Sequence, residues 1–202
     1  MHPALFLKGL LIGLAIAAPV GPIGVLCIRR TLKDGRGAGV ATGMGAATAD
    51  AAYGCVAAFG LTSVSGYLLR HQSWISVCGG AFLCYLGART FLSRPATGSS
   101  PAHSGRLFAA YGSTLLLTLA NPATVLSFAV VFAALGLPST ASYPSAGGMV
   151  LGVFTGSALW WLALSTIVSL GRSRIDASWM QAINRVSGAV LFAFGIYAIL
   201  RT

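Results

Sequence analysis

Six long apolar runs constrain this chain more than any other feature of its sequence. Each run is close to the ~20 residues that an α-helix needs to cross a bilayer. The predicted spans are Ala4–Ile28, Gly37–Leu61, Trp74–Leu92, Leu107–Leu135, Gly147–Leu170 and Ile183–Leu200. Only 8% of the 202 residues are charged, against roughly 25% in a soluble domain, so a soluble globule would lack polar surface. The sequence therefore predicts an all-α polytopic membrane protein, with one transmembrane domain over residues 1–202 embedded in the lipid bilayer.

The basic residues are placed as they are in membrane proteins. The formal net charge is +10, but these residues lie mostly between the apolar runs or at their ends, so we expect no nucleic-acid partner. They gather in loops one, three and five, around Arg29–Arg36, Arg89–Arg106 and Arg172–Arg174, whereas loop four (136–146) carries no charge. By the positive-inside rule, loops one, three and five are the predicted cytoplasmic loops, and both termini lie outside.

The two halves of the chain share local patterns in the same order. Gly80-Ala81-Phe82-Leu83 with Gly87 in span three matches Gly188-Ala189-Val190-Leu191 with Gly195 in span six. Spans two and five carry ladders of small residues at spacing four, and spans one and four each contain a proline break. Three spans per half give the halves opposite orientations. We therefore predict two inverted repeats, about 4–92 and 107–202, joined by a linker at 93–106, as in many secondary transporters.

The prolines mark a candidate binding site. Pro19 and Pro22 lie inside span one, and Pro122 lies inside span four. One interpretation is a plain kink at each proline. The other is a true break, because Asn is a strong N-cap and Pro is favoured at the first helical position, so Asn121-Pro122 and Gly21-Pro22 can each start a half-helix. Such an N-terminus binds anions such as a carboxylate. The second interpretation predicts a substrate site of Pro19, Gly21, Pro22, Asn121 and Pro122.

Asp50 is the only acidic residue within a predicted span. A charge there costs roughly 2.5–3.5 kcal/mol on insertion scales. It is either a protonated carboxyl that is hydrogen-bonded between helices, or a site for a cation: a proton, a metal ion or a substrate ammonium. Because burial favours the protonated carboxyl, proton exchange near neutral pH is physically reasonable. Together, Asp50 and the helix N-termini would suit a zwitterionic amino acid.

Enzymatic and metal-binding alternatives lack their residues in the sequence. His2, His71 and His103 lie in loops or near a terminus, and a second acid within a span is missing. The four cysteines form no C-x-x-C pair and fit small apolar packing residues. We expect no catalytic residues, no metal site and no cofactor.

The motifs resemble those of the LysE-type family of bacterial amino-acid exporters. The resemblance covers the whole chain and is carried mainly by Ala18-Pro19-Val20-Gly21-Pro22-Ile23-Gly24, then by Cys27-Ile28-Arg29-Arg30-Thr31-Leu32, Gly35-Arg36, the glycine ladder to Ala49-Asp50, and Asn121-Pro122. It implies an inner-membrane secondary carrier that moves small amino acids outward, driven by the proton gradient, and a homodimer. The Ile-Gly-Ala-Gln-Asn run associated with lysine export is replaced here by Ile23-Gly24-Val25-Leu26, which puts lysine or arginine as the substrate in doubt.

The primary hypothesis is therefore a carrier that exports amino acids or similar small zwitterionic or cationic metabolites, with Asp50 coupling transport to protons. Two alternatives stay open from the sequence. One is a divalent metal-ion efflux carrier, for which a single Asp is a poor ligand set. The other is a non-transporting membrane assembly protein built on the glycine ladders.

Overall fold

The computed structural model describes residues 3–19, 21–58, 70–93, 104–121, 124, 128, 143–172 and 177–200. Within these ranges it is all-helical, with no strand. The helices are α1 (Pro3–Ala17), α2 (Pro22–Asp34), α3 (Arg36–Ala58), α5 (Gln72–Phe91), α6 (Ser104–Leu119), α8 (Tyr143–Gly171) and α9 (Ala177–Leu200). The predicted fold class is thereby confirmed as all-helical for the described residues.

The first predicted span is broken where Gly21-Pro22 predicts it. α1 ends at Ala17, α2 begins at Pro22, and the two helices are bent by 80°. Gly21 is the N-cap in an extended conformation, and Pro22 occupies the first turn. Proline suits this position because its missing N–H would have no intrahelical acceptor there, and its φ is already helical.

The prediction of a loop at Arg29–Arg36 is wrong. α2 continues through Arg29, Arg30 and Lys33 to Asp34, and only Gly35 separates it from α3. Gly35 has a φ of 95°, a left-handed conformation that favours glycine. The apolar run ends before Arg29, but the helix continues. It can do so because polar groups of neighbouring helices accept hydrogen bonds from the guanidinium groups of Arg29 and Arg30.

Two helices of the described part are long and apolar enough to cross a bilayer by themselves, Ala146–Gly171 and Ser178–Leu200. The bent α1–α2 pair is a third candidate if it counts as one span. The structure thus supports a membrane protein with two or three candidate spans, and the six-span arrangement stays a prediction.

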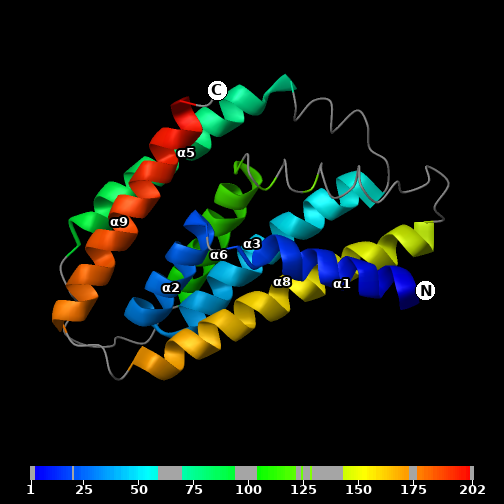
Figure 1. The fold of residues 1–202 in the computed structure, drawn as a ribbon, viewed down its shortest axis with the longest axis horizontal. Helices are drawn as coiled ribbons and strands as arrows, with labels where there is room; N and C mark the ends of the chain where they lie inside the picture. Colours follow the sequence, from blue (N-terminus) through cyan, green and yellow to red (C-terminus); the bar gives the residue numbers. More distant parts are fainter. Residues whose placement is uncertain are drawn as a thin grey trace.

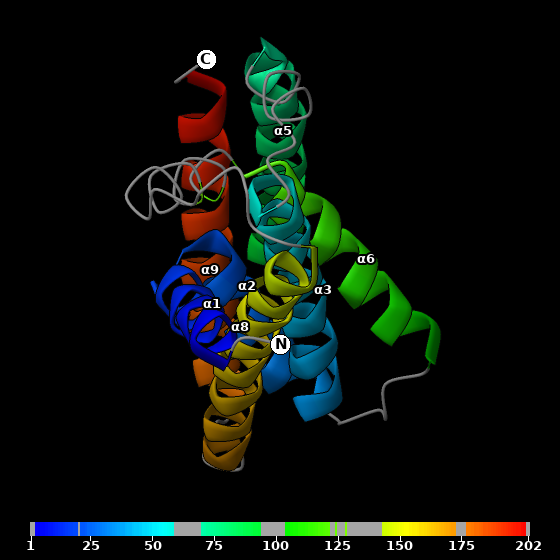
Figure 2. The same ribbon diagram turned by 90° about the vertical axis from the view of Figure 1, so that its right-hand side faces the viewer.

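The helices pack mainly in four pairs: α1 on α8, α3 on α8, α3 on α6, and α5 on α9. Figures 1 and 2 show α5 and α9 running side by side. In Figure 1 this pair is separated from the α1–α8 pair. Glycines allow close approach in each pair. For example, a Cβ at Gly87 would lie 2.6 Å from the Phe192 backbone nitrogen. Small residues therefore bring the backbones together, as is typical of membrane helices.

Candidate functional site

A small polar cavity lies where the α1–α2 break meets α3, α6 and α8. Its volume is about 70 Å³. The region of the break supplies Ile16, Ala17, Pro19, Gly21, Pro22, Ile23 and Gly24. The opposite walls come from Ala46 and Asp50 of α3 and from Trp161 of α8. The end of α6 and the residues after it contribute Thr118, Asn121 and Thr124. Segments far apart in the sequence thus converge on one cavity.

Asp50 is held in this cavity by a chain of hydrogen bonds from α8. Its side chain is only 3% exposed. The Ser157 hydroxyl donates to Asp50 Oδ2 at 2.6 Å, and Trp161 Nε1 donates to Ser157 Oγ at 3.2 Å. Ser157 is fully buried. The carboxyl group therefore has a defined position between α3 and α8.

The α1–α2 break brings two helix ends of opposite polarity to the cavity. Ile23 and Gly24 lie in the first turn of α2, where backbone N–H groups have no intrahelical acceptor. Ile16 and Ala17 lie in the last turn of α1, where the carbonyl groups are the unsatisfied ones. The N-terminus of α2 favours a negative group, and the C-terminus of α1 favours a positive one.

The end of α6 forms another wall. The helix ends at Leu119, and the Asn121 carbonyl accepts the Thr124 amide at 3.0 Å. Tyr53 Oη donates to the Leu119 carbonyl and so satisfies one group at this end. The Tyr53 ring stacks on Phe128, with centroids 5.6 Å apart. Buried groups from α3 therefore support the helix end beside the cavity.

Two arginines of α2 anchor this helix to its neighbours in both halves of the chain. Arg30 donates to Thr42 Oγ1 at 3.1 Å, to the Ala110 carbonyl at 3.0 Å, and to Thr114 Oγ1 and Ser113 Oγ at 2.9 Å each. Arg29 donates to Asn184 Oδ1 at 3.0 Å and to Ser93 Oγ at 3.1 Å. Neutral oxygens from α3, α6, α9 and Ser93, two residues after α5, thus solvate these guanidinium groups, which explains how a helix holds them inside the bundle.

Comparison with known proteins decides the family. The sequence model of the LysE type translocator family matches residues 14–202. The chain belongs to the LysE type translocator family.

Two relatives are similar to this LysE-type chain over most of their length. The "Putative amino acid efflux protein YcgF" of Bacillus subtilis (strain 168) is 25% identical over 199 residues, which cover 96% of this chain and 94% of the relative. The "Uncharacterized membrane protein YahN" of Escherichia coli (strain K12) is 31% identical over 180 residues, which cover 85% of this chain and 78% of the relative. No solved structure matches. Membership makes the chain a membrane transport protein.

The structure brings most of the predicted site residues of this LysE-type protein together. Pro19, Gly21, Pro22, Asn121 and Asp50 all line the small polar cavity. Pro122 lies outside the described residues. Their predicted roles, substrate binding for the first four and cation coupling for Asp50, stay predictions.

Sequence reasoning missed three residues of this site: Ser157, Thr118 and Trp161. Trp161 is buried, at 4% exposure, but it also lines the cavity. The spacing of four between Ser157 and Trp161 places them on one face of α8, although nothing in the local sequence shows that Asp50 lies opposite that face. Only the packing of α3 on α8 reveals it.

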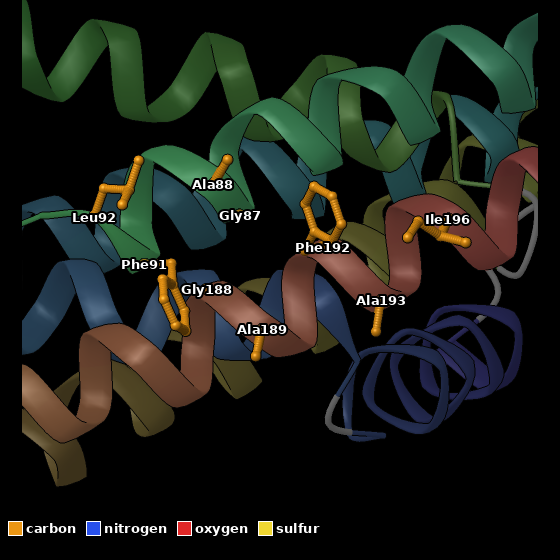
Figure 3. Close-up of a pocket in the computed structure, with 9 residues that line it drawn as sticks. All are labelled: Gly87, Ala88, Phe91, Leu92, Gly188, Ala189, Phe192, Ala193 and Ile196. Carbon is orange, nitrogen blue, oxygen red and sulfur yellow. The ribbon is translucent and has the colours of Figure 1, made fainter.

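A larger cavity of about 500 Å³ lies between α5 and α9, and unlike the first it has an apolar lining (Figure 3). Its walls are apolar side chains and glycines: Gly87, Ala88, Phe91, Leu92, Gly188, Ala189, Phe192, Ala193 and Ile196. No side chain that lines this cavity carries a charge or a hydrogen-bonding group. The small polar cavity is therefore the candidate site of the LysE-type chain.

Proposed function

We propose that this chain is a secondary carrier that exports amino acids, or similar small zwitterionic or cationic metabolites, across the bacterial inner membrane. One observation carries the proposal: a single buried cavity is lined both by a carboxyl group, Asp50, and by the N-terminus of a 13-residue helix, α2. These groups favour opposite charges, so the cavity complements a molecule that carries an ammonium and a carboxylate. The amino acid efflux named for the Bacillus relative agrees with this substrate class.

Transport requires the cavity to change size. A volume of about 70 Å³ holds about two water molecules, whereas pockets for small molecules are usually ~300–1,000 Å³. In the proposed alternating-access cycle, the site would therefore widen before it takes up the substrate. The α1–α2 break is the natural place for the movement, because the cavity wall there is formed by two helix ends rather than by a continuous helix.

Asp50 would couple this cycle to the proton gradient. The residue is buried, and in the described part of the chain no Lys or Arg lines the same cavity. A carboxylate in this position needs a cationic partner, which can be a proton or the substrate ammonium. Exchange of one for the other would make export proton-driven.

The helix pairing supports the predicted inverted repeats. Glycine contacts show that α1 of the first half packs parallel to α8 of the second, and that α6 of the second half packs parallel to α3 of the first. The remaining major pairs, α3 with α8 and α5 with α9, join corresponding spans of the two halves in antiparallel directions. A two-fold axis that exchanges the halves would produce this set of contacts.

Contacts between helix ends support the assignment of the odd-numbered connections to one side of the membrane, which we propose is the cytoplasmic side. Arg172, in the predicted loop five, donates to the Leu32 and Lys33 carbonyls at the end of α2, at 2.8 and 3.0 Å. Arg29 reaches Ser93, where loop three begins, at 3.1 Å. The C-terminal ends of α2, α5 and α8 thus lie close to one another. The proposed topology keeps both termini outside, and the homodimer stays a prediction.

Divalent-metal export is less well supported. Among the described residues, no group of three or more His, Cys, Asp and Glu could hold a metal ion, and Asp50 is the only acidic side chain lining the polar cavity. A non-transporting assembly role would produce no flux at all, so a flux measurement addresses it directly.

The test measures counterflow of each of the twenty protein amino acids into proteoliposomes that contain the purified protein, with and without a pH gradient. We expect accelerated exchange of at least one amino acid. Asp50→Asn should abolish the stimulation by the pH gradient, whereas Asp34→Asn, at the end of α2 and outside the cavity, should behave like the wild type. Flux of metal ions but of no amino acid would overturn the substrate class. Full stimulation of Asp50→Asn would overturn the coupling role.

A further inference from the structure

The Thr118 hydroxyl is the one buried side-chain polar atom of the described residues that lacks a hydrogen-bond partner. The residue is on α6 and is 3% exposed. Burying a hydroxyl without a partner is unfavourable, and buried polar groups in native proteins nearly always have one. An exception of this kind needs a reason in the function or in the packing.

Other buried threonines of this bundle have partners. Thr31, Thr42 and Thr114 each donate to the backbone carbonyl four residues earlier, all at 2.8 Å. Thr114 lies one turn before Thr118 on the same helix and also accepts from Arg30. The helical backbone therefore offers this bond as a rule in this protein, but the Thr118 hydroxyl does not make it.

The position of Thr118 gives the reason. It lines the same polar cavity as Asp50 and lies in the last turn of α6. Carbonyl groups at a helix C-terminus carry partial negative charge, and Asp50 adds a carboxyl group. This part of the cavity therefore favours a positive group, whereas the N-terminus of α2 favours a negative one.

We propose that Thr118 Oγ1 is a hydrogen-bond acceptor for the ammonium group of the transported solute, beside the Asp50 carboxylate. The inference rests on the proposed function, and it deepens it by assigning the two poles of the substrate. A hydroxyl accepts N–H donors with its lone pairs, while Asp50 balances the charge. Because the hydroxyl has no partner within the protein, the solute gains this hydrogen bond without breaking another.

Thr118→Val separates this role from a structural one. Valine has nearly the same shape but no hydroxyl, so it removes an unpaired polar atom from the interior. The purified variant should melt at the same temperature as the wild type or at a higher one. Its KM should rise about tenfold or more, as expected for a lost hydrogen bond to a charged group, while its maximal rate changes little.

The probe is the protein amino acid that the wild type exchanges fastest in proteoliposomes. Thr118→Ser keeps the hydroxyl and should restore most of the affinity. Thr166→Val is the matched control, because the Thr166 hydroxyl bonds the Leu162 carbonyl on an outer face of α8, and it should leave KM unchanged. The deaminated analogue of the probe, used as a competitor, has a carboxylate but no ammonium, so its inhibition constant should differ less than about twofold between the wild type and Thr118→Val.

Three results would overturn the assignment. An unchanged KM in Thr118→Val would show that the hydroxyl does not contact the solute. A lower melting temperature together with a proportional loss of rate would indicate a structural role. If Thr118→Val lost as much affinity for the deaminated analogue as for the probe, Thr118 would contact the carboxylate of the solute instead of its ammonium. If the wild type exchanges no amino acid, the proposed function itself fails, and this outcome is distinct from the other three.

Discussion

Ser157 donates a 2.6 Å hydrogen bond to Asp50 across the contact between α3 and α8, and the two residues are 107 positions apart in the sequence. The same hydroxyl accepts from Trp161 Nε1 at 3.2 Å. All three side chains are at most 4% exposed. The carboxyl group proposed to carry the coupling cation is therefore positioned by the second half of the chain, although it belongs to the first.

Removing the Ser157 hydroxyl should destabilise the protein. Ser157→Ala leaves the Trp161 N–H and one Asp50 oxygen without their partner, and an unpaired buried group costs about 1–3 kcal/mol. In a double-mutant cycle with Asp50→Ala, thermal unfolding in detergent should give a coupling of about 0.5–3 kcal/mol. Additive effects of the two substitutions would show that the bond contributes nothing to stability.

Two glycines on α8 should respond oppositely to alanine. A Cβ at Gly156 would overlap the Leu10 carbonyl of α1, whereas a Cβ at Gly147 meets nothing within 4 Å. Gly156→Ala should push α1 away and cost about 1–3 kcal/mol. Gly147→Ala should be neutral or stabilise by up to about 1 kcal/mol, because alanine favours the helix. Melting temperatures of the two purified variants provide the comparison, and equal values would argue against the close contact of α1 and α8.

Arg30→Lys should loosen the contact between α2 and α6. A lysine ammonium has three donors on a single atom and cannot reproduce the planar fork that reaches Thr42, Ala110, Thr114 and Ser113. We expect a loss of about 1–3 kcal/mol, measured by thermal unfolding. Arg36→Lys is the control, because Arg36 is exposed at the start of α3, and it should melt within about 0.5 kcal/mol of the wild type.

The proposed topology predicts which positions a membrane-impermeant thiol reagent can reach in whole cells. In a variant without the four native cysteines, Arg70→Cys in loop two should be labelled from outside. Gly105→Cys, in the first turn of α6 next to loop three, should be labelled only after the membrane is permeabilised. Both positions are exposed. Labelling in the reverse order would invert the orientation of the carrier.

Local chemistry made part of the site predictable from the sequence. Gly21 and Pro22 mark the break because a proline suits the first turn of a helix and interrupts an existing one. Asp50 is conspicuous because it is the only acid within an apolar run. Properties of single residues and their immediate neighbours are sufficient for both inferences.

The end of the first span shows where this reasoning stops. Arg29 and Arg30 suggest a loop in the sequence, because charged side chains are costly in a bilayer. In the structure they lie within α2 and donate to oxygens of α3, α6, α9 and Ser93. Those oxygens come from distant segments, so the local pattern could not show that the guanidinium groups are hydrogen-bonded.

By itself, the sequence determined the helical membrane class, the position of the first helix break and the identity of the isolated acid, because each depends on local hydropathy and backbone chemistry. Only the tertiary structure decided that Ser157 holds Asp50, that Trp161 lines the cavity and that Thr118 has no partner. Hydrogen-bond satisfaction in a bundle depends on which helix faces are in contact, and glycine ladders along several helices permit close contacts without specifying which of them form.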